Sequence, residues 1–239
     1  MGQVLVDLGR LDEALAAYDS ALTVDADYAI AWYNKGSLLQ TLERPEEALA
    51  AYYRVVRIDS QNKAAWVRIG EIQLDLKRLE EAAAAFSTAL MIDPGLEPVW
   101  LCQGLVLNTL QRFTEAMAAF DEVLRLNGKS IDAAYWRGVA LYELGRTTEA
   151  VVAFDRALAI HSYHVGSLHY KTALLHVLGR IDEAIVASDQ LIALDVSSAR
   201  AWYNRSKVLK SAGRIDEAEA AYDRAVDIEP SSYERRTDS

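Results

Sequence analysis

The sequence predicts an all-α fold, an α-solenoid of antiparallel helix pairs, and three observations support that prediction. One motif recurs along the chain with a fixed period of 34 residues. Within each period, apolar residues follow the spacing i, i+3, i+4 and i+7, which places them on one face of a helix. The 239 residues include only 12 glycines and 4 prolines. Because Ala, Leu, Glu and Arg are abundant instead, the composition favours helices throughout.

The period is visible in several residue types at once. Trp32, Trp66 and Trp100 are 34 residues apart, and Trp202 lies three further periods along the chain. A Glu-Ala pair recurs seven times without an insertion, at Glu13, Glu47, Glu81, Glu115, Glu149, Glu183 and Glu217. An Arg stands three residues before each Glu, at Arg10, Arg44, Arg78, Arg112, Arg146, Arg180 and Arg214. An aromatic residue follows each Ala by four residues, except at Ser188.

Each period contains two predicted helices, a first helix (A) and a second helix (B). In the second copy, the predicted buried faces are Trp32, Gly36 and Leu39 on helix A and Ala48, Tyr52 and Val55 on helix B. Pro45 suits the first turn of helix B, where a missing N–H is harmless. In four other copies a glycine occupies the turn between the helices, where a left-handed residue closes helix A: Gly9, Gly145, Gly179 and Gly213.

This pattern resembles the tetratricopeptide repeat, with Trp, Gly and Leu or Tyr on helix A and Ala, an aromatic residue and Ala on helix B. The resemblance covers essentially the whole chain and implies a right-handed superhelix formed by a single array over 1–232. Full repeats 2 to 7 then run over 29–62, 63–96, 97–130, 131–164, 165–198 and 199–232. Residues 1–28 form a truncated first repeat, and 233–239 a tail or the start of an eighth helix A.

The motif has a packing reason. Small residues at position 8, such as Gly36 and Gly138, and at position 20, the seven alanines, let helices A and B approach closely. Large residues at positions 4 and 24 fill the space between neighbouring pairs. No repeat can bury its faces alone, so stability depends on neighbouring repeats. Repeat 6 departs most, with Leu168, Thr172 and Ser188 at positions 4, 8 and 24, and we expect its packing to be the loosest.

Composition limits the possible partners and compartments. The net charge of −10 disfavours nucleic acid and anionic membrane surfaces, both of which need a basic protein surface. No apolar stretch approaches the roughly 20 residues that span a bilayer, and the N-terminal residues lack the pattern of a signal peptide. The single cysteine, Cys102, excludes an internal disulfide and fits a reducing compartment. We therefore expect a cytoplasmic protein.

No set of residues predicts catalysis, so we expect no enzyme activity and no cofactor. The repeated Glu serves the repeat, because its negative charge meets the dipole at the start of helix B. Cys102 has no His beside it in the sequence. His161, His164, His169 and His176 fall within 16 residues, but no Cys or carboxylate stands near them at zinc-like spacing. We expect surface or groove histidines rather than a metal site.

The resemblance also implies a binding surface, because helix A of successive repeats lines a concave groove in that family. The residues predicted to line it here are Tyr33, Asn34, Ser37, Arg68, Glu71, Leu101, Tyr135, Tyr142, His169, Tyr203, Lys207 and Lys210. The middle of this groove is apolar and aromatic with acidic edges, and the last repeat is basic. We expect a peptide with hydrophobic anchors, its acidic groups near repeat 7 and its basic groups near repeats 3 to 5.

Two more specific sites of the family are incomplete. A carboxylate clamp for chaperone tails is matched by Asn34 and Arg68, but Gln3 and Ala64 replace required groups. An asparagine ladder at position 6 is matched by Asn34 and Asn204 alone. The predicted function is therefore a scaffold or adaptor that binds a peptide or partner segment in the groove. A scaffold that self-associates through its terminal repeats, or the regulatory array of a larger enzyme, stays an alternative.

Overall fold

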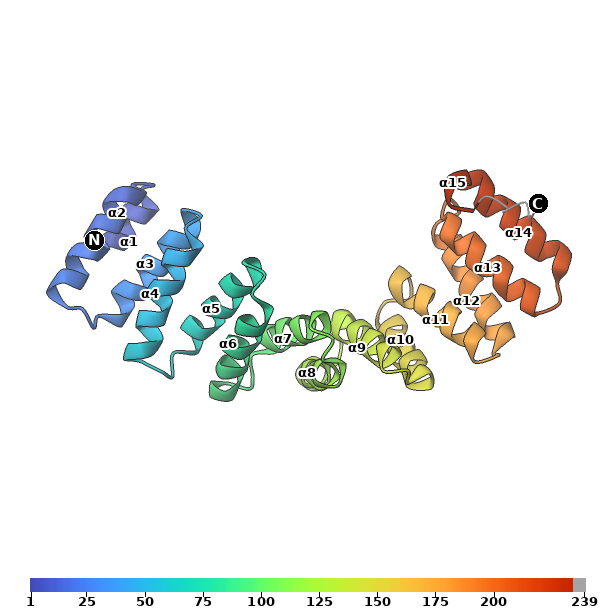
Figure 1. The fold of residues 1–239 in the computed structure, drawn as a ribbon, viewed down its shortest axis with the longest axis horizontal. Coiled ribbons are helices and arrows are strands. Elements are labelled where there is room, and N and C mark those ends of the chain that lie inside the picture. Colours follow the sequence, from blue (N-terminus) through green and yellow to red (C-terminus); the bar gives the residue numbers. More distant parts are fainter. Residues whose placement is uncertain (234–239) are drawn as a thin grey trace. The chain divides into compact units, whose positions relative to one another are not determined.

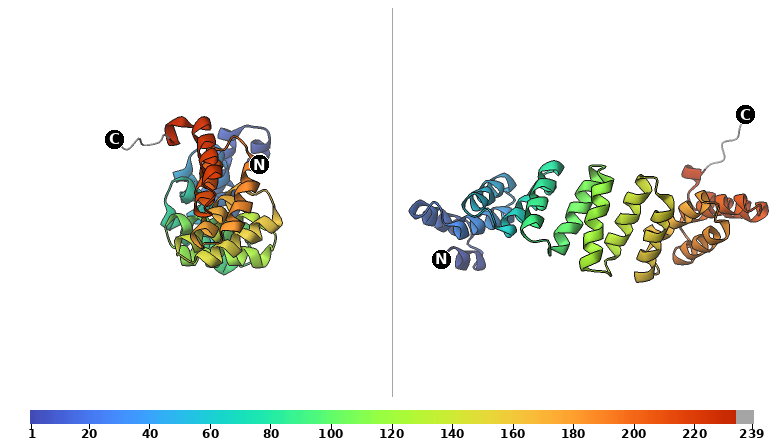
Figure 2. Two further views of the ribbon diagram at one scale, coloured as in Figure 1. Left: turned by 90° about the vertical axis from the view of Figure 1, so that its right-hand side faces the viewer. Right: turned by 90° about the horizontal axis from the view of Figure 1, so that it is seen from below.

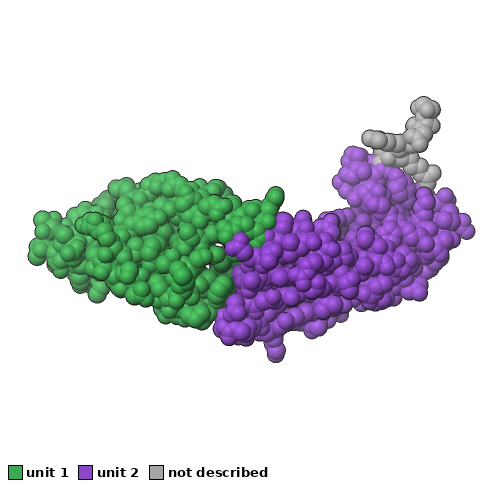
Figure 3. All heavy atoms as spheres, turned by 60° about the horizontal axis from the view of Figure 1, so that its bottom comes forward, with its two compact units in different colours: residues 1–112 green, residues 113–239 purple. Residues whose placement is uncertain are grey.

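The computed structural model describes residues 1–233, which form fifteen α-helices and no strand, as predicted (Figure 1). Two compact units divide the chain, residues 1–112 and 113–239, and each is described by itself (Figure 3). Unit 1 contains α1 (Gly2–Asp7), α2 (Leu11–Val24), α3 (Ala29–Thr41), α4 (Pro45–Ile58), α5 (Lys63–Asp75), α6 (Leu79–Ile92) and α7 (Glu97–Thr109). Unit 2 contains α8 (Phe113–Leu126), α9 (Ile131–Glu143), α10 (Thr147–Ile160), α11 (Val165–Val177), α12 (Ile181–Leu194), α13 (Ala199–Ser211), α14 (Ile215–Ile228) and α15 (Pro230–Tyr233).

Within each unit, every helix packs on its neighbours in the sequence, so that pairs lie side by side (Figure 2). The A helices α3, α5, α7, α9, α11 and α13 begin at the first position of the corresponding predicted repeat. Pro45 is the first residue of α4, as expected. A tail or an eighth helix A was predicted over 233–239; Tyr233 is the last residue of α15, and 234–239 lie outside the described part of the chain.

The turn from helix A to helix B contains a left-handed residue in every repeat. Gly9, Gly145, Gly179 and Gly213 have φ between 71° and 74°, which confirms the predicted helix-closing role. The other three repeats adopt the same conformation without glycine, at Glu43 (φ 55°), Lys77 (φ 62°) and Gln111 (φ 59°). The backbone conformation of this turn is therefore the same in all seven repeats, although the residue type differs.

The turn from helix B to the next helix A is fixed by side chains that the sequence analysis did not assign. The indole Nε1 of Trp32 donates to the carbonyl oxygen of Ala26 (2.8 Å), and that of Trp66 donates to Ser60 (3.0 Å). Trp100 and Trp202 make the same bond to the residue six positions earlier. The tryptophan of position 4 therefore ties its own helix to the preceding turn as well as filling space.

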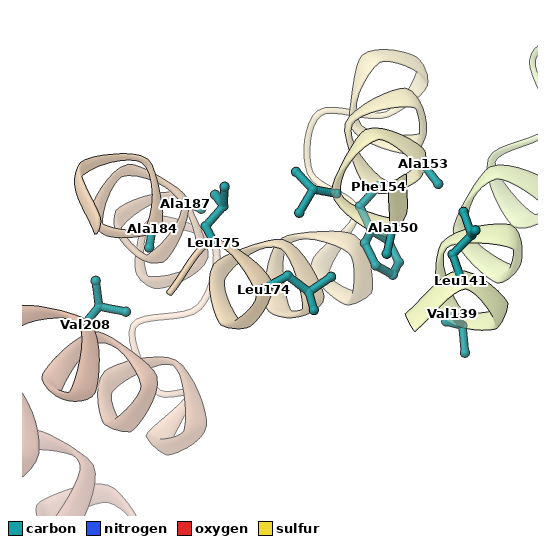
Figure 4. Close-up of a cluster of buried hydrophobic side chains, with 11 residues drawn as sticks. Val139, Leu141, Ala150, Ala153, Phe154, Leu174, Leu175, Ala184, Ala187 and Val208 are labelled. Carbon is teal, nitrogen blue, oxygen red and sulfur yellow. The ribbon is translucent and has the colours of Figure 1, made fainter. Parts of the chain in front are cut away.

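Position 8 must be small because the aromatic ring of position 24 lies directly over it. A Cβ atom added to Gly70 would lie 2.5 Å from the Phe86 ring, and one added to Gly138 would lie 2.7 Å from the Phe154 ring. The alanine at position 20 is completely buried in six repeats and 5% exposed at Ala218. Both observations confirm the packing role predicted for the small residues. Figure 4 shows Phe154 in the core of unit 2, among side chains of α9 to α13.

Repeat 6 has different residues at positions 8 and 24, where the two helices pack. Thr172 and Ser188 replace the glycine and the aromatic ring, and both are completely buried. Their hydroxyls donate to carbonyl oxygens of their own helices, at Leu168 (2.8 Å) and Ile185 (2.7 Å). A larger residue at position 8 is thus combined with a smaller one at position 24. That this repeat packs most loosely stays a prediction.

The recurrent arginines form ion pairs with the recurrent glutamates, which supports a structural role for both. In five repeats the Arg pairs with the Glu three residues later, as Arg44 does with Glu47 (2.6 Å). Arg78 instead reaches Glu46 of the preceding repeat (2.5 Å). These pairs are solvent-exposed, so each adds little stability.

Candidate functional site

In unit 1, four of the predicted groove residues gather around one tyrosine ring. Tyr33 packs edge-on against Tyr52, with ring centroids 5.3 Å apart. The Tyr52 hydroxyl donates to Gln40 Oε1 (2.9 Å). Burial raises the pKa of Tyr52 to about 12, and a hydrogen bond with Ser37 opposes that rise. The Tyr33 hydroxyl and Glu71 raise the pKa of Arg68.

The one cation in this group is already neutralised. Arg68 Nη1 lies 2.8 Å from Glu71 Oε2. A nearby hollow of about 300 Å³ is acidic, since its lining of Gln40, Glu43, Pro45, Ile72, Asp75 and Leu76 includes two carboxylates. Of the remaining predicted residues in unit 1, Asn34 and Leu101 lie on A helices but make no side-chain interaction that joins them to this group.

In unit 2, predicted groove residues belong to a larger group of rings, the aromatic cluster, made of Tyr135, Tyr142, Phe154, His164 and Tyr170. Tyr170 stacks on Phe154 with centroids 5.0 Å apart and planes at 11°. It also meets Tyr142 edge-on (5.4 Å) and Tyr135 (6.1 Å). Tyr135 in turn meets His164 at 4.9 Å. Helices α9, α10 and α11 thus contribute to one aromatic surface.

Tyr170 is the residue that the sequence analysis missed. It occupies position 6, at which only Asn34 and Arg68 were predicted to line the groove. A signal was present, because position 6 is aromatic in repeats 5 and 6, at Trp136 and Tyr170, but polar or small in the other repeats. The position of its ring at the centre of the cluster depends on Phe154 of the preceding repeat, which supplies the surface on which it stacks.

Two charges of opposite sign, those of Glu143 and Arg200, act on Tyr170 in the aromatic cluster. Burial raises the pKa of Tyr170, and Glu143 raises it further while Arg200 lowers it. Burial lowers the pKa of His169, and the positive charge of Arg200 lowers it further. His169 is therefore a neutral, half-buried side chain next to a permanent cation. Glu143 extends from the end of α9 and Arg200 from the start of α13, so the two charges belong to different repeats.

The two cations of α13 that were predicted to line the groove, Lys207 and Lys210, line a hollow. Its volume is about 560 Å³, and its lining is Tyr203, Ser206, Lys207, Lys210, Ile215, Ala218, Glu219 and Tyr222. We call this the α13–α14 hollow. Lys207 Nζ lies 4.8 Å from the centre of the Tyr203 ring, a cation–π contact that leaves the charge of the ammonium group in place. Lys207 and Lys210 are both exposed.

Two of the four histidines, His164 and His176, have hydrogen-bond partners, whereas the buried Nδ1 of His169 has none among the described residues. His164 caps α11, because its Nδ1 accepts from the backbone N–H of Ser167 (3.2 Å), and His176 Nε2 lies 2.7 Å from Ser211 Oγ. Within residues 1–233, no three His, Cys, Asp or Glu side chains stand close enough to hold a metal ion. Burial raises the pKa of the half-buried Cys102 thiol. In the same range, no helix has the length and apolarity needed to cross a membrane.

Family models decide the classification. A tetratricopeptide repeat model matches residues 1–63, 102–164 and 175–233, and a second tetratricopeptide repeat model matches residues 40–101. The chain belongs to the tetratricopeptide repeat family. The periodic tryptophans, glycines and alanines described above are its tetratricopeptide signature. No curated protein sequence matches the chain significantly.

Solved structures of tetratricopeptide repeat proteins share the fold at low sequence identity. The crystal structure of MamA is 21% identical over 73% of this chain and 97% of that one, with a TM-score of 0.68. YrrB, described as a TPR protein with an unusual peptide-binding site, is 22% identical over 75% of this chain and 93% of that one, with a TM-score of 0.67. A tetratricopeptide repeat protein from Parabacteroides merdae is 19% identical over 95% of this chain and 90% of that one, with a TM-score of 0.60.

Proposed function

We propose that this protein is a scaffold that binds a segment of a partner protein against the A helices of unit 2. The observation that carries the proposal is the aromatic cluster, in which Tyr135, Tyr142 and Tyr170 from two successive repeats meet on one surface. Tyr142 is 44% exposed although it packs on Tyr170. A partner segment therefore meets a ring that its neighbours already hold in position.

The physical chemistry of such a surface favours protein segments over small ligands. Tyrosine offers a wide apolar ring at a low cost in conformational entropy, together with a hydroxyl that can form a hydrogen bond. Adjacent rings on neighbouring helices provide several anchor points along an extended or helical segment. Peptide binding by YrrB, a structural relative with the same fold, supports the choice of ligand class.

The test is selection of random 15-residue peptides on the immobilised full chain. Selected peptides are then measured individually against wild-type protein and the Tyr142→Ala variant. Removal of an exposed aromatic anchor is expected to weaken binding by about tenfold or more, which corresponds to about 1.4 kcal/mol. Tyr163→Ala is the matched control, because Tyr163 is 66% exposed in the turn between α10 and α11 and lies outside the aromatic cluster.

Two results contradict the proposal. One is that wild-type protein selects no peptide above background. The other is that Tyr142→Ala and Tyr163→Ala affect the selected peptides equally. Light scattering on the same sample separates peptide binding from self-association through the terminal repeats, which predicts a mass that rises with concentration.

A further inference from the structure

We infer that the bound segment is acidic and that its carboxylates lie against Arg200, Lys207 and Lys210 of α13, called here the basic face. The inference rests on the proposed function and specifies the chemistry of the partner. Its apolar side chains then lie on the aromatic cluster, which Arg200 adjoins. Four observations support this assignment: the pairing of charges, the shape of the surface, the opposite charge near the aromatic cluster, and the contrast with unit 1.

The first observation is that the basic face is not neutralised by the protein itself. Other cations on the A helices of unit 2 are paired across repeats: Arg137 with Asp121 (2.5 Å), Lys171 with Asp155 (2.6 Å) and Arg205 with Asp189. Among the residues that the structure describes, none supplies a carboxylate partner to Arg200, Lys207 or Lys210. The three cations are seven and three residues apart along α13, a spacing that places them on one face of the helix.

The second observation is that the basic face has room for a ligand. Lys207 and Lys210 line the α13–α14 hollow of about 560 Å³, opposite Ile215 and Glu219 of α14. Glu219 is the single carboxylate in that lining, so the two lysines leave an excess of positive charge. Tyr203 and Ser206 belong to the same lining, and the Ser206 hydroxyl donates to the carbonyl oxygen of Tyr203 (2.8 Å). A carboxylate side chain therefore meets both cations and an apolar wall.

The third observation is that the A helices before and after α11 contribute opposite charges near Tyr170. Glu143 lies on α9 and Arg200 on α13, and the two charges shift the pKa of Tyr170 in opposite directions. A segment that crosses the cluster experiences a charge gradient along its length. The charge gradient therefore orients the bound segment, with its acidic residues against α13 and its neutral or basic residues near α9.

Unit 1 does not offer the same site. Its groove cation, Arg68, is paired with Glu71, and the adjacent hollow contains Glu43 and Asp75. A net charge of −10 also repels an acidic segment from the molecule as a whole. An acidic segment therefore prefers the basic face, because three cations lie there in a protein whose net charge is negative.

The experiment uses the peptide selection described above, repeated on the Lys207→Glu/Lys210→Glu double variant. Lys129→Glu/Arg224→Glu is the matched control: it changes the net charge by the same amount at two exposed positions outside the basic face. Peptides selected on wild-type protein are expected to be enriched in Asp and Glu relative to the library. They are expected to bind the double variant at least about tenfold more weakly and the control variant with wild-type affinity.

The outcomes distinguish this inference from the proposed function. Peptides that depend on Tyr142 but have the average charge of the library overturn the inference and leave the proposed function standing. Equal weakening by both double variants also overturns it, because only total charge would then matter. If wild-type protein selects no peptide, both the inference and the proposed function fail. Lys207→Gln/Lys210→Gln, which removes the charges without reversing them, repeats the test should the double glutamate variant lack the circular dichroism spectrum of the wild type.

Discussion

At the scale of single residues, the turn between helices A and B uses two solutions to one backbone requirement. Four repeats place glycine at positive φ, and three place Glu43, Lys77 or Gln111 there. An L residue with a side chain is disfavoured in this region by roughly 1 kcal/mol relative to glycine. The non-glycine turns are therefore sites of small, local strain.

The first prediction concerns this strain. Lys77→Gly is expected to raise the free energy of unfolding by about 0.5–1 kcal/mol, because glycine removes the conformational penalty. Gly145→Ala is expected to lower it by about 1 kcal/mol for the same reason, since an added Cβ would meet no atom within 4 Å and so create no clash. Urea denaturation measures both. A destabilising Lys77→Gly variant would contradict the explanation.

The second prediction concerns Tyr52, whose pKa is raised by burial to about 12. An ordinary tyrosine in the unfolded chain ionises near pH 10, so the folded state holds this proton more tightly. The stability contributed by the neutral phenol is complete below pH 10 and is lost as the pH rises from 10 to 12. Tyr52→Phe is expected to reduce the loss of stability in that window, measured by denaturation at several pH values. An unchanged slope would show that Tyr52 titrates normally.

The sequence predicted candidate binding positions but could not say which of their side chains were free of other partners. Tyr135, Tyr142, Tyr203, Lys207 and Lys210 were predicted from position within the repeat. Whether a side chain is free depends on neighbours from other repeats, and the sequence does not give those contacts. The ion pair of Arg68 with Glu71 and the stacking of Tyr170 on Phe154 are two such cases.

At the scale of elements, the helix pair depends on complementary volumes at positions 8 and 24. In repeats 2, 3 and 5 a glycine lies beneath an aromatic ring, whereas in repeat 6 Thr172 is combined with Ser188. The helical pattern, the helix starts and the need for small residues could all be predicted from the 34-residue period. The indole bonds of the tryptophans could not, because they depend on the path of the preceding turn.

The third prediction tests that complementarity in repeat 6. Ser188→Phe alone is expected to destabilise the protein by about 1–3 kcal/mol, because the ring overlaps Thr172. Adding Thr172→Gly is expected to restore at least about 1 kcal/mol, as a coupling energy in a double-mutant cycle. The cycle is measured by thermal and urea unfolding of the wild type, the two single variants and the double variant. Additive effects of the two substitutions would contradict the pairing of these positions.

At the scale of the whole molecule, contacts within each unit run mainly between helices adjacent in the sequence, so stability is a sum of local terms. The fourth prediction follows from this. Phe154→Ala removes a completely buried ring and is expected to cost about 3–5 kcal/mol locally. Hydrogen exchange should accelerate in α9, α10 and α11, while α2 to α6 keep wild-type protection. Uniform acceleration along the chain would contradict the local account.

The charge distribution also belongs to this scale. The other cations on the A helices of unit 2 form ion pairs. The three cations of the basic face have no carboxylate partner within residues 1–233. The total charge could be read from the sequence and argued against nucleic acid. The pairing that singles out the basic face depends on partners 16 residues away, on the B helix of the preceding repeat, as for Arg137 and Asp121.

The most direct test of the central claim is a crystal structure of the full chain bound to a selected peptide. The peptide is expected to lie across α9, α11 and α13, with an apolar side chain on Tyr142 or Tyr170. At least one of its carboxylates should lie within 4 Å of Arg200, Lys207 or Lys210, a usual limit for an ion pair. A peptide bound along the B helices, or one that turns its basic end toward α13, would contradict the account.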